Sequence, residues 1–122
     1  VFAGAADQSI GAGSANTDAI ILAHAQGAPE TSYAAGLARD YNGGGYTDWF
    51  LPSRYEMIEM FSKKAVINTN ATANGGSNFA NNSYWNSTEE TTNNANRQGF
   101  DNGAQGSQSK SVGLFVRAVR AF

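Results

Sequence analysis

The side chains in this sequence that are best suited to chemistry are its carboxylates and its one histidine. Glu89, Glu90 and Asp101 lie near many asparagines, and calcium prefers such oxygen ligands in proteins. His24 is the sole histidine, and the sequence places no partner residue near it that a metal or catalytic site would need. We therefore expect no catalytic residue, no metal-ligating residue and no cofactor, with structural calcium left open as an alternative.

The motifs of the common enzyme classes are missing. Cysteine is absent, which excludes disulfides, thiolate metal sites and a cysteine nucleophile. The chain has no Ser–His–Asp order, no HExxH motif and no P-loop. Asp48 and Glu56 could form a carboxylate pair, but nothing in the sequence places them in a cleft. We therefore expect a protein that is not an enzyme.

The composition favours one globular domain over residues 1–122. Hydrophobic residues make up 41% of the chain, enough for a core, while charged residues make up only 15%. The net charge is -2 and lysine and arginine do not cluster, so a nucleic-acid partner is not expected. No apolar run approaches the roughly 20 residues of a membrane-spanning helix, so direct membrane insertion is not expected either.

Helical patterns fill the first half of the chain. We expect three helices, within residues 17–27, 31–45 and 53–67. In the second, Tyr33, Leu37 and Tyr41 recur at a spacing of four residues, which predicts its core-facing side. Ser53 and Glu56 have the spacing of a capping box, so they predict the start of the third helix.

Strand patterns dominate the second half, separated by long polar loops from Asn68 onward. The expected strands are the opening residues and the ranges 46–53, 83–89, 97–100 and 112–122. Residues 101–103, Asp-Asn-Gly, are a strong hairpin-turn signal. Helices followed by a small antiparallel sheet favour the α+β class, and about residues 68–122 would carry the loops and strands of a binding face.

Four aromatic and basic side chains have a structural interpretation. Trp49 and Trp85 are expected in the core, because large aromatic rings bury much apolar area. Arg117 and Arg120 lie in a strand-like stretch, so one of them should point inward and need a carboxylate partner. The candidate partners are Asp48, Glu56 and Glu89.

Three ordered stretches resemble a known family: "GLARDYNGGGYTDWFLPSRYEM", "YWNSTE" and "FVRAVRAF". They are similar to the C-type lectin-like superfamily and, more narrowly, to bacterial and phage ligand-binding domains of the Lcl C-terminal type. The matching motif residues are Asp48, Trp49, Leu51, Pro52, Ser53, Tyr84, Trp85, Ser87, Thr88, Glu89, Val116, Arg117, Val119 and Arg120. The resemblance covers about residues 36–122 and implies a C-type lectin-like fold.

The same scaffold is used by variable proteins of diversity-generating retroelements, in which mutated template adenines change asparagine codons near the C-terminus. The resemblance therefore implies a diversifiable binding face held by a constant framework. The apparent framework residues are Ala95, Gln98, Phe100, Gly103, Gln105 and Lys110. The candidate face is Tyr84, Thr92, Asn94, Asn96, Arg97, Asp101, Asn102, Ser107, Gln108, Ser111, Leu114 and Phe115.

The expected function is ligand recognition, of the adhesin or phage receptor-binding type, by a domain of a larger extracellular, cell-surface or virion protein. Its partner would be a protein or glycan on a target cell surface, and an oligomer is compatible with this function. One alternative is a structural subunit of a fibre or pilus. Another is a calcium-dependent lectin, although the sugar-binding motifs Glu-Pro-Asn, Gln-Pro-Asp and Trp-Asn-Asp are missing.

Overall fold

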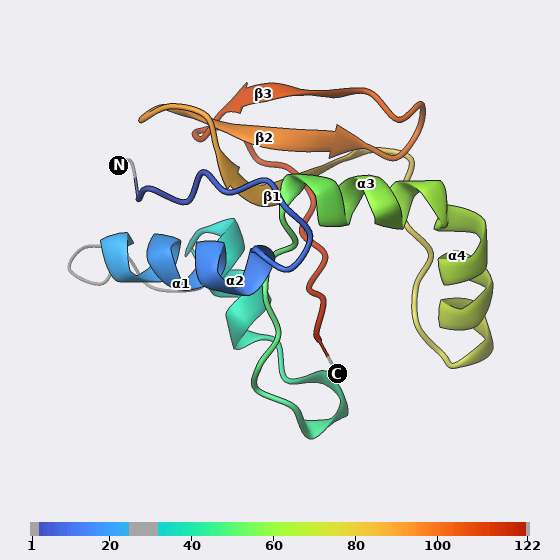
Figure 1. The fold of residues 1–122 in the computed structure, drawn as a ribbon. Coiled ribbons are helices and arrows are strands. Elements are labelled where there is room, and N and C mark those ends of the chain that lie inside the picture. Colours follow the sequence, from blue (N-terminus) through green and yellow to red (C-terminus); the bar gives the residue numbers. More distant parts are fainter. Residues whose placement is uncertain (1–2, 25–31, 122) are drawn as a thin grey trace.

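The computed structural model describes residues 3–24 and 32–121, and it confirms the α+β class (Figure 1). The helices are α1 (Gly13–His24), α2 (Ala34–Asp40), the short 3-10 turn η2 (Gly43–Gly45), α3 (Arg54–Ser62) and α4 (Lys64–Ala73). The strands are β1 (Ser83–Glu89), β2 (Asn94–Gly99) and β3 (Gln105–Ser109). They form one antiparallel sheet in the order β1-β2-β3. Within the described ranges, the search for a helix of membrane-spanning length and hydropathy finds none.

Strand β1 is the centre of the fold. One of its edges pairs with β2, and along its other edge Trp85, Ser87 and Glu89 each donate a backbone N–H to a different part of the chain. The acceptors are the carbonyl oxygens of Phe115, Pro52 and Ala5, at 3.0, 2.7 and 2.7 Å. Segments from the start, middle and end of the chain therefore meet on a single strand.

The expectation of a final strand over residues 112–122 is wrong. This segment forms only two isolated bridges, one between Tyr84 and Phe115 and one between Phe50 and Val119. The second bridge is also all that remains of the strand expected over 46–53, and residues 3–8 form no strand. Conversely, β3 was missed, because its sequence Gln-Gly-Ser-Gln-Ser lacks the β-branched and aromatic residues that favour strands.

The two faces of β1 bury two separate hydrophobic clusters. Trp85 packs on Leu51 and the alanines of α2 on one face. On the other face, Tyr84 packs with Met57 and Phe100 beneath α3. Successive residues of a strand point to opposite faces, so the Tyr-Trp pair supplies one large aromatic ring to each cluster.

The start of α3 is confirmed as a capping box. The Ser53 side chain accepts the backbone N–H of Glu56, and the Glu56 carboxylate accepts the backbone N–H of Ser53 at 2.7 Å. The helix is shorter than expected, because the chain turns at Lys63 and continues as α4 to Ala73. The loop expected from Asn68 therefore begins only after Ala73.

The core-facing side expected for the second helix is correct only at Tyr33, which packs, partly buried, against the cluster around Trp85. Leu37 and Tyr41 are 43% and 52% exposed, whereas Ala35 and Ala38 are buried against Leu51 and Trp85. The small alanines of α2 therefore supply its core contacts, while the larger Leu37 and Tyr41 stay outside. The expected ends at Gly27 and Thr31 lie outside the described residues.

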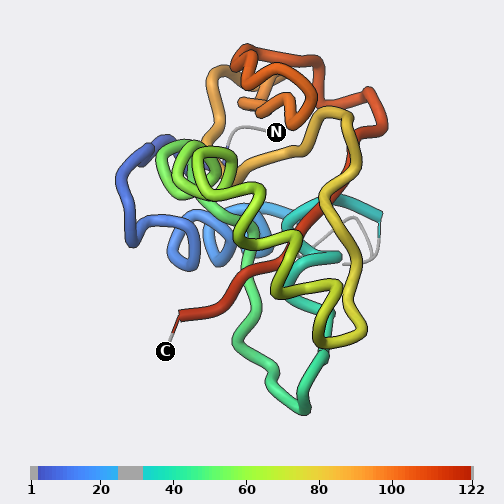
Figure 2. The backbone as a smooth tube through the Cα atoms, turned by 90° about the vertical axis from the view of Figure 1, so that its right-hand side faces the viewer, coloured from blue at the N-terminus to red at the C-terminus, as the bar shows by residue number. Residues whose placement is uncertain are grey.

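Trp49 is half-buried, so its expected place in the core is only partly correct. Its indole N–H donates to the Gly43 carbonyl oxygen at 3.1 Å, and its ring meets Tyr41 edge to face at 4.9 Å. The turn around Gly43–Gly45 lies at the opposite end of the molecule from the β2–β3 hairpin in both views (Figures 1 and 2). Trp49 therefore stabilises a region remote from the hairpin.

Candidate functional site

The β2–β3 hairpin carries most of the residues expected to bind a ligand. Its register pairs Asn94 with Ser109 at one end and Gln98 with Gln105 at the other. β3 is the edge strand, and none of its residues is buried. One side-chain hydrogen bond ties it to α3, from Arg54 Nε to Gln105 Oε1 at 3.1 Å. The hairpin thus presents an uncharged polar strand to solvent.

The twelve candidate residues differ widely in exposure. The exposed members are Thr92, Asp101, Asn102, Ser107, Ser111 and Phe115. The half-buried members are Asn94, Arg97, Gln108 and Leu114. Tyr84 and Asn96 are buried, being 4% and 2% exposed. Tyr84 belongs to the core beneath α3, and Asn96 donates its side-chain N–H to the Thr88 carbonyl oxygen at 3.1 Å.

The candidate residues do not form one patch. Thr92 and Ser111 lie where β2 begins and β3 ends, while Asp101 and Asn102 form the turn at the other end of the hairpin. A strand the length of β2 separates these ends by about 20 Å. Phe115 lies at the far edge of β1, beside Tyr84. The central members are close along the strands but fall on two faces of the sheet, Arg97 with Gln108 on one and Asn94 with Ser107 on the other.

Arg97 is the distinctive side chain of this central group. It pairs with Gly106 on β3, and a Cβ on Gly106 would lie 3.4 Å from Arg97 Nη2, so the guanidinium extends across β3 at that residue. In the part of the chain that the structure describes, Arg97 makes no side-chain hydrogen bond or ion pair. The other arginines, Arg39, Arg54, Arg117 and Arg120, all do. Arg97 is therefore a cation available to a ligand.

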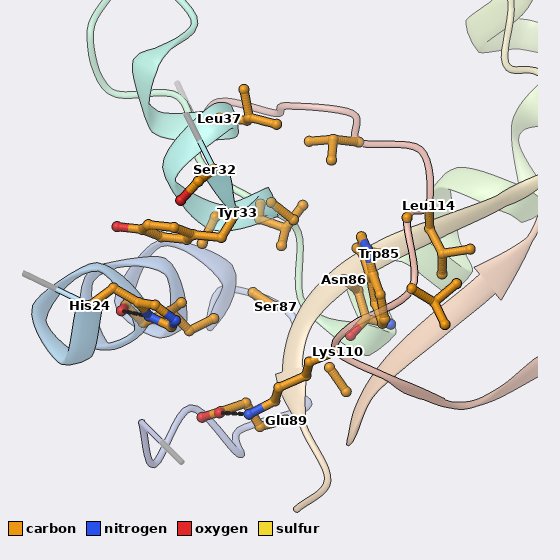
Figure 3. Close-up of a pocket in the computed structure, with 18 residues that line it drawn as sticks. His24, Ser32, Tyr33, Leu37, Trp85, Asn86, Ser87, Glu89, Lys110 and Leu114 are labelled. Carbon is orange, nitrogen blue, oxygen red and sulfur yellow. Dashed lines mark hydrogen bonds and ion pairs between the residues drawn. The ribbon is translucent and has the colours of Figure 1, made fainter. Parts of the chain in front are cut away.

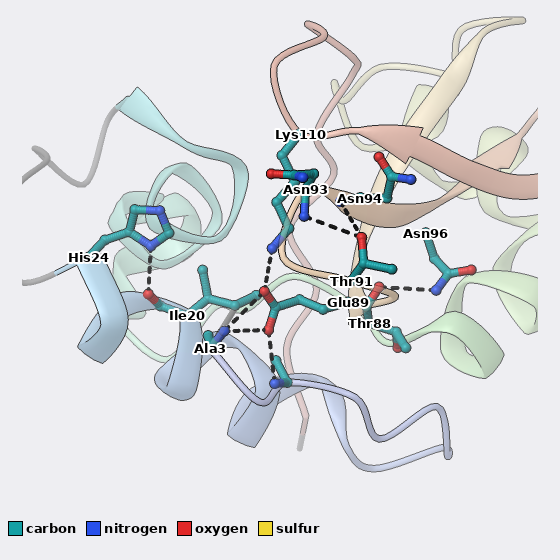
Figure 4. Close-up of polar contacts among 11 residues, drawn as sticks. Ala3, Ile20, His24, Thr88, Glu89, Thr91, Asn93, Asn94, Asn96 and Lys110 are labelled. Carbon is teal, nitrogen blue, oxygen red and sulfur yellow. Dashed lines mark hydrogen bonds and ion pairs between the residues drawn. The ribbon is translucent and has the colours of Figure 1, made fainter. Parts of the chain in front are cut away.

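The root of the hairpin is held by a buried carboxylate (Figure 4). Glu89 accepts backbone N–H groups from Ala3 and Ala5 at 2.9 and 3.0 Å, and pairs with Lys110 Nζ at 2.5 Å. Burial alone would raise the pKa of Glu89, but the hydrogen bonds from Lys110, Ala3 and Ala5 outweigh burial and lower this pKa. The network fixes the N-terminal segment and the chain after β3 to the end of β1.

The carboxylate partners expected for the two C-terminal arginines are partly correct. Arg120 Nε pairs with Asp48 at 2.5 Å, but this pair is at the surface, since the Asp48 side chain is 58% exposed. Arg117 has a different environment: it donates to the Ser77 carbonyl oxygen at 3.1 Å and lies 4.5 Å from the centre of the Phe79 ring. Glu89 pairs with Lys110 instead, a lysine 21 residues away that no local pattern indicated.

The carboxylates considered for calcium do not converge. Glu89 is already neutralised by Lys110, and Asp101 lies at the opposite end of the hairpin from Glu90. Among residues 3–24 and 32–121, no three acidic or histidine side chains gather as a metal site would require. His24 lies on α1, where its Nδ1 is 2.9 Å from the Ile20 carbonyl oxygen and its ring stacks on Tyr33.

Comparison with known protein families gives a match to the Lcl C-terminal domain over residues 13–120. The chain belongs to this family. The match extends further toward the N-terminus than the motifs that first indicated it, since it includes α1. No curated protein and no solved structure shows a significant match. The family supports a surface-associated domain of the bacterial or phage type.

The motif residues of this Lcl C-terminal domain form its framework. Leu51 is 2% exposed in the cluster around Trp85, and Pro52 supplies the carbonyl oxygen that accepts from Ser87. Ser53 caps α3 and also donates its hydroxyl to the Ser9 carbonyl oxygen at 2.8 Å. The motifs therefore hold β1 in place, and they leave the ligand to be contacted by other residues.

Proposed function

We propose that this Lcl C-terminal domain is a recognition domain that binds a protein or glycan on a target cell surface without catalysing a reaction. It would act as part of an extracellular, cell-surface or virion protein of the adhesin or receptor-binding type. The observation that supports this most is Arg97, a half-buried cation without a partner in the described chain, which shares its face of the hairpin with Gly106 and the uncharged polar side chain of Gln108. A cation held in this way favours a ligand with an acidic or carbonyl oxygen.

The architecture supports recognition as well. The hairpin is anchored through β1, whose residues from Tyr84 to Glu89 are all buried, while β3 stays accessible. A rigid scaffold that carries adaptable polar side chains is a common design of binding proteins. We retain a C-type lectin-like scaffold as part of the proposal.

We further propose that a diversity-generating retroelement varies the residues of this surface. Four asparagines lie in the hairpin and its flanking turns, at 93, 94, 96 and 102. Sequencing this gene across its source population, over codons 83–115, tests the idea. Changes confined to adenine-containing codons of exposed residues, with Trp85, Gln98 and Phe100 constant, would support it. Uniformly low variation would contradict diversification and would indicate a recognition domain of fixed specificity.

Binding itself is tested with a glycan array and an array of bacterial surface proteins, probed with the wild-type domain. For any spot that binds, Arg97→Ala combined with Ser107→Ala should weaken binding at least about tenfold, the effect of losing a charged hydrogen bond at an interface. Phe115→Ala should retain binding, because Phe115 lies at the far edge of β1. Lys63→Ala, on the exposed surface between α3 and α4, is the matched control for loss of a charge.

Thermal unfolding of each variant separates lost contacts from lost structure. We expect the melting temperature of the Arg97→Ala, Ser107→Ala variant to stay close to that of the wild type. Binding that persists in this variant and disappears in Phe115→Ala would move the site to the edge of β1. Absence of binding on both arrays would contradict the recognition function itself.

A further inference from the structure

A groove of about 300 Å³ lies between the helices α1 and α2 and the sheet. Tyr33 and His24 lie on one side of it, and Trp85 and Leu114 on the other (Figure 3). Much of the remaining wall is aliphatic: Ile20, Leu37, Leu51, Ala95, Val112 and Val116. An apolar groove with few polar groups is the usual form of a small-molecule site.

The groove is electrically neutral along its described walls. Its charged lining residues there are Glu89 and Lys110, which pair with each other at 2.5 Å at one end (Figure 3). The Glu89 carboxylate also accepts backbone N–H groups from Ala3 and Ala5, so its acceptor sites are occupied. A charged ligand would lose its hydration without meeting an opposite charge, which disfavours binding.

The size and shape of the groove restrict its occupant further. An apolar protein cavity of about 150 Å³ accommodates benzene, so one of twice that volume suits about two fused rings. Aromatic side chains on both sides, Tyr33 and Trp85, favour a flat ring that lies between them. The partly exposed rims at Leu37 and Val112, 43% and 39% accessible, give such a molecule an apolar entrance.

We propose that this groove binds a neutral, planar, largely apolar molecule of about two fused rings. Arg97 does not line this groove, although it is the cross-strand partner of Trp85 on the same face of the sheet, and the groove proposal stands whether or not the hairpin ligand is found. The structure offers a direct probe of it, because the chain has two tryptophans and only Trp85 lines the groove. Trp49 does not line the groove, and its indole N–H is held by the Gly43 carbonyl oxygen, although Leu37 and Val116 line both the groove and a second pocket that contains Trp49.

The test is a titration of the ¹⁵N-labelled domain with 2-naphthol, followed by the two indole N–H resonances. Trp49→Phe assigns them, and about pH 8 keeps the naphthol hydroxyl mainly protonated. We expect the Trp85 resonance to shift with a dissociation constant on the order of 10⁻⁴ M, a usual efficiency for so small a ligand. The Trp49 resonance should stay in place, and 2-naphthalenesulfonate should bind at least about tenfold more weakly.

Gly113→Leu is the variant that blocks the groove. Gly113 lines the groove, and a Cβ there would meet no atom within 4 Å, so a larger side chain fits at this wall without displacing the backbone. We expect 2-naphthol affinity to fall at least about tenfold. Ala104→Leu, an exposed position in the hairpin turn, is the matched control and should bind as the wild type does.

Val112→Ser provides a second test if Gly113→Leu unfolds, since it makes an exposed part of the rim polar. It should weaken 2-naphthol binding and leave the fold intact. The proposal is overturned if the Trp85 resonance does not move at millimolar 2-naphthol, or if both tryptophans shift together. Equal affinity for 2-naphthol and 2-naphthalenesulfonate would overturn the neutral class of ligand.

Discussion

Strands β1 and β3 are both rich in polar residues, yet one is the most buried element of the sheet and the other the most exposed. β1 reads Ser-Tyr-Trp-Asn-Ser-Thr-Glu, and six of its seven residues are buried. β3 reads Gln-Gly-Ser-Gln-Ser, and none is buried. The two strands differ in their hydrogen-bonding partners. β1 has such segments along both edges, whereas among the described residues β3 has one only along its β2 edge. Polar residues can be buried where their hydrogen bonds are satisfied, so composition alone does not decide burial.

The largest contrast should come from the tryptophans. Trp85→Ala removes a core ring 8% exposed beside Leu51, and we expect it to lower the free energy of unfolding by about 3–5 kcal/mol. Trp49→Ala, at a half-buried position, should cost clearly less. Chemical denaturation of both variants measures this difference. Equal losses would mean that β1 is not the structural centre.

Lys110 tests whether β1 depends on its buried ion pair. Lys110→Ala leaves the Glu89 carboxylate buried with two backbone donors and no cation, and we expect a loss of about 2 kcal/mol. Lys63→Ala is the matched control, because its pair with Glu59 is exposed and such pairs contribute less than about 1 kcal/mol. The measurement is the urea midpoint at neutral pH. A Lys110→Ala variant as stable as Lys63→Ala would show that the backbone hydrogen bonds alone hold Glu89.

The pH dependence of the free energy of unfolding should also depend on the Glu89 carboxylate, with a smaller effect than that of Lys110→Ala. The pKa of Glu89 is lower in the folded protein than its ordinary value of about 4.3. Its contribution is therefore fully present above that value and is lost as the pH falls below it, through the folded pKa. Urea midpoints measured across this acidic range should fall less steeply for Glu89→Gln than for the wild type. Parallel curves for the two proteins would contradict this assignment.

The smallest effect is expected on β3. Ser107→Ala and Gln108→Ala alter side chains of the edge strand, exposed and half-buried, that make no side-chain hydrogen bond within the described residues. Their free energies of unfolding should stay within about 0.5 kcal/mol of the wild type, as is usual for surface positions. Denaturation curves measure this, and the same preparations serve in the binding arrays. A loss comparable to that of Lys110→Ala would make β3 part of the framework rather than a surface for ligands.

Local signals allowed several elements to be predicted correctly. The Ser53–Glu56 capping box depends on residues three apart, and β1 on a run containing two large aromatics. The hairpin turn at residues 101–103 follows from Asp-Asn-Gly. Signals that depend on distant partners failed: the spacing of Tyr33, Leu37 and Tyr41 predicted a buried face, but packing against the sheet selected the alanines. How closely two elements pack depends on the side chains of both, whereas a local sequence pattern contains the side chains of only one of them.

The candidate site was predicted in part for the same reason. The sequence indicated the region of Arg97, Ser107 and Gln108, but it also included Tyr84, which the sheet buries, and Phe115, which lies beyond β1. The Glu89–Lys110 pair and the groove beside Trp85 had no sequence signal. Each of them is formed by segments that meet only after folding.

By itself, the sequence determined the α+β class, the helix cap, the Tyr-Trp strand and the family, because these depend on residues close together along the chain. Only the tertiary structure decided which strand became central and which polar residues were buried. It also decided where the groove opened. These outcomes depend on hydrogen bonds and contacts between segments as distant as Ala5, Pro52 and Phe115, which all meet on β1. A backbone N–H of β1 can be buried only when one of those carbonyl oxygens reaches it, and that is a property of the fold as a whole.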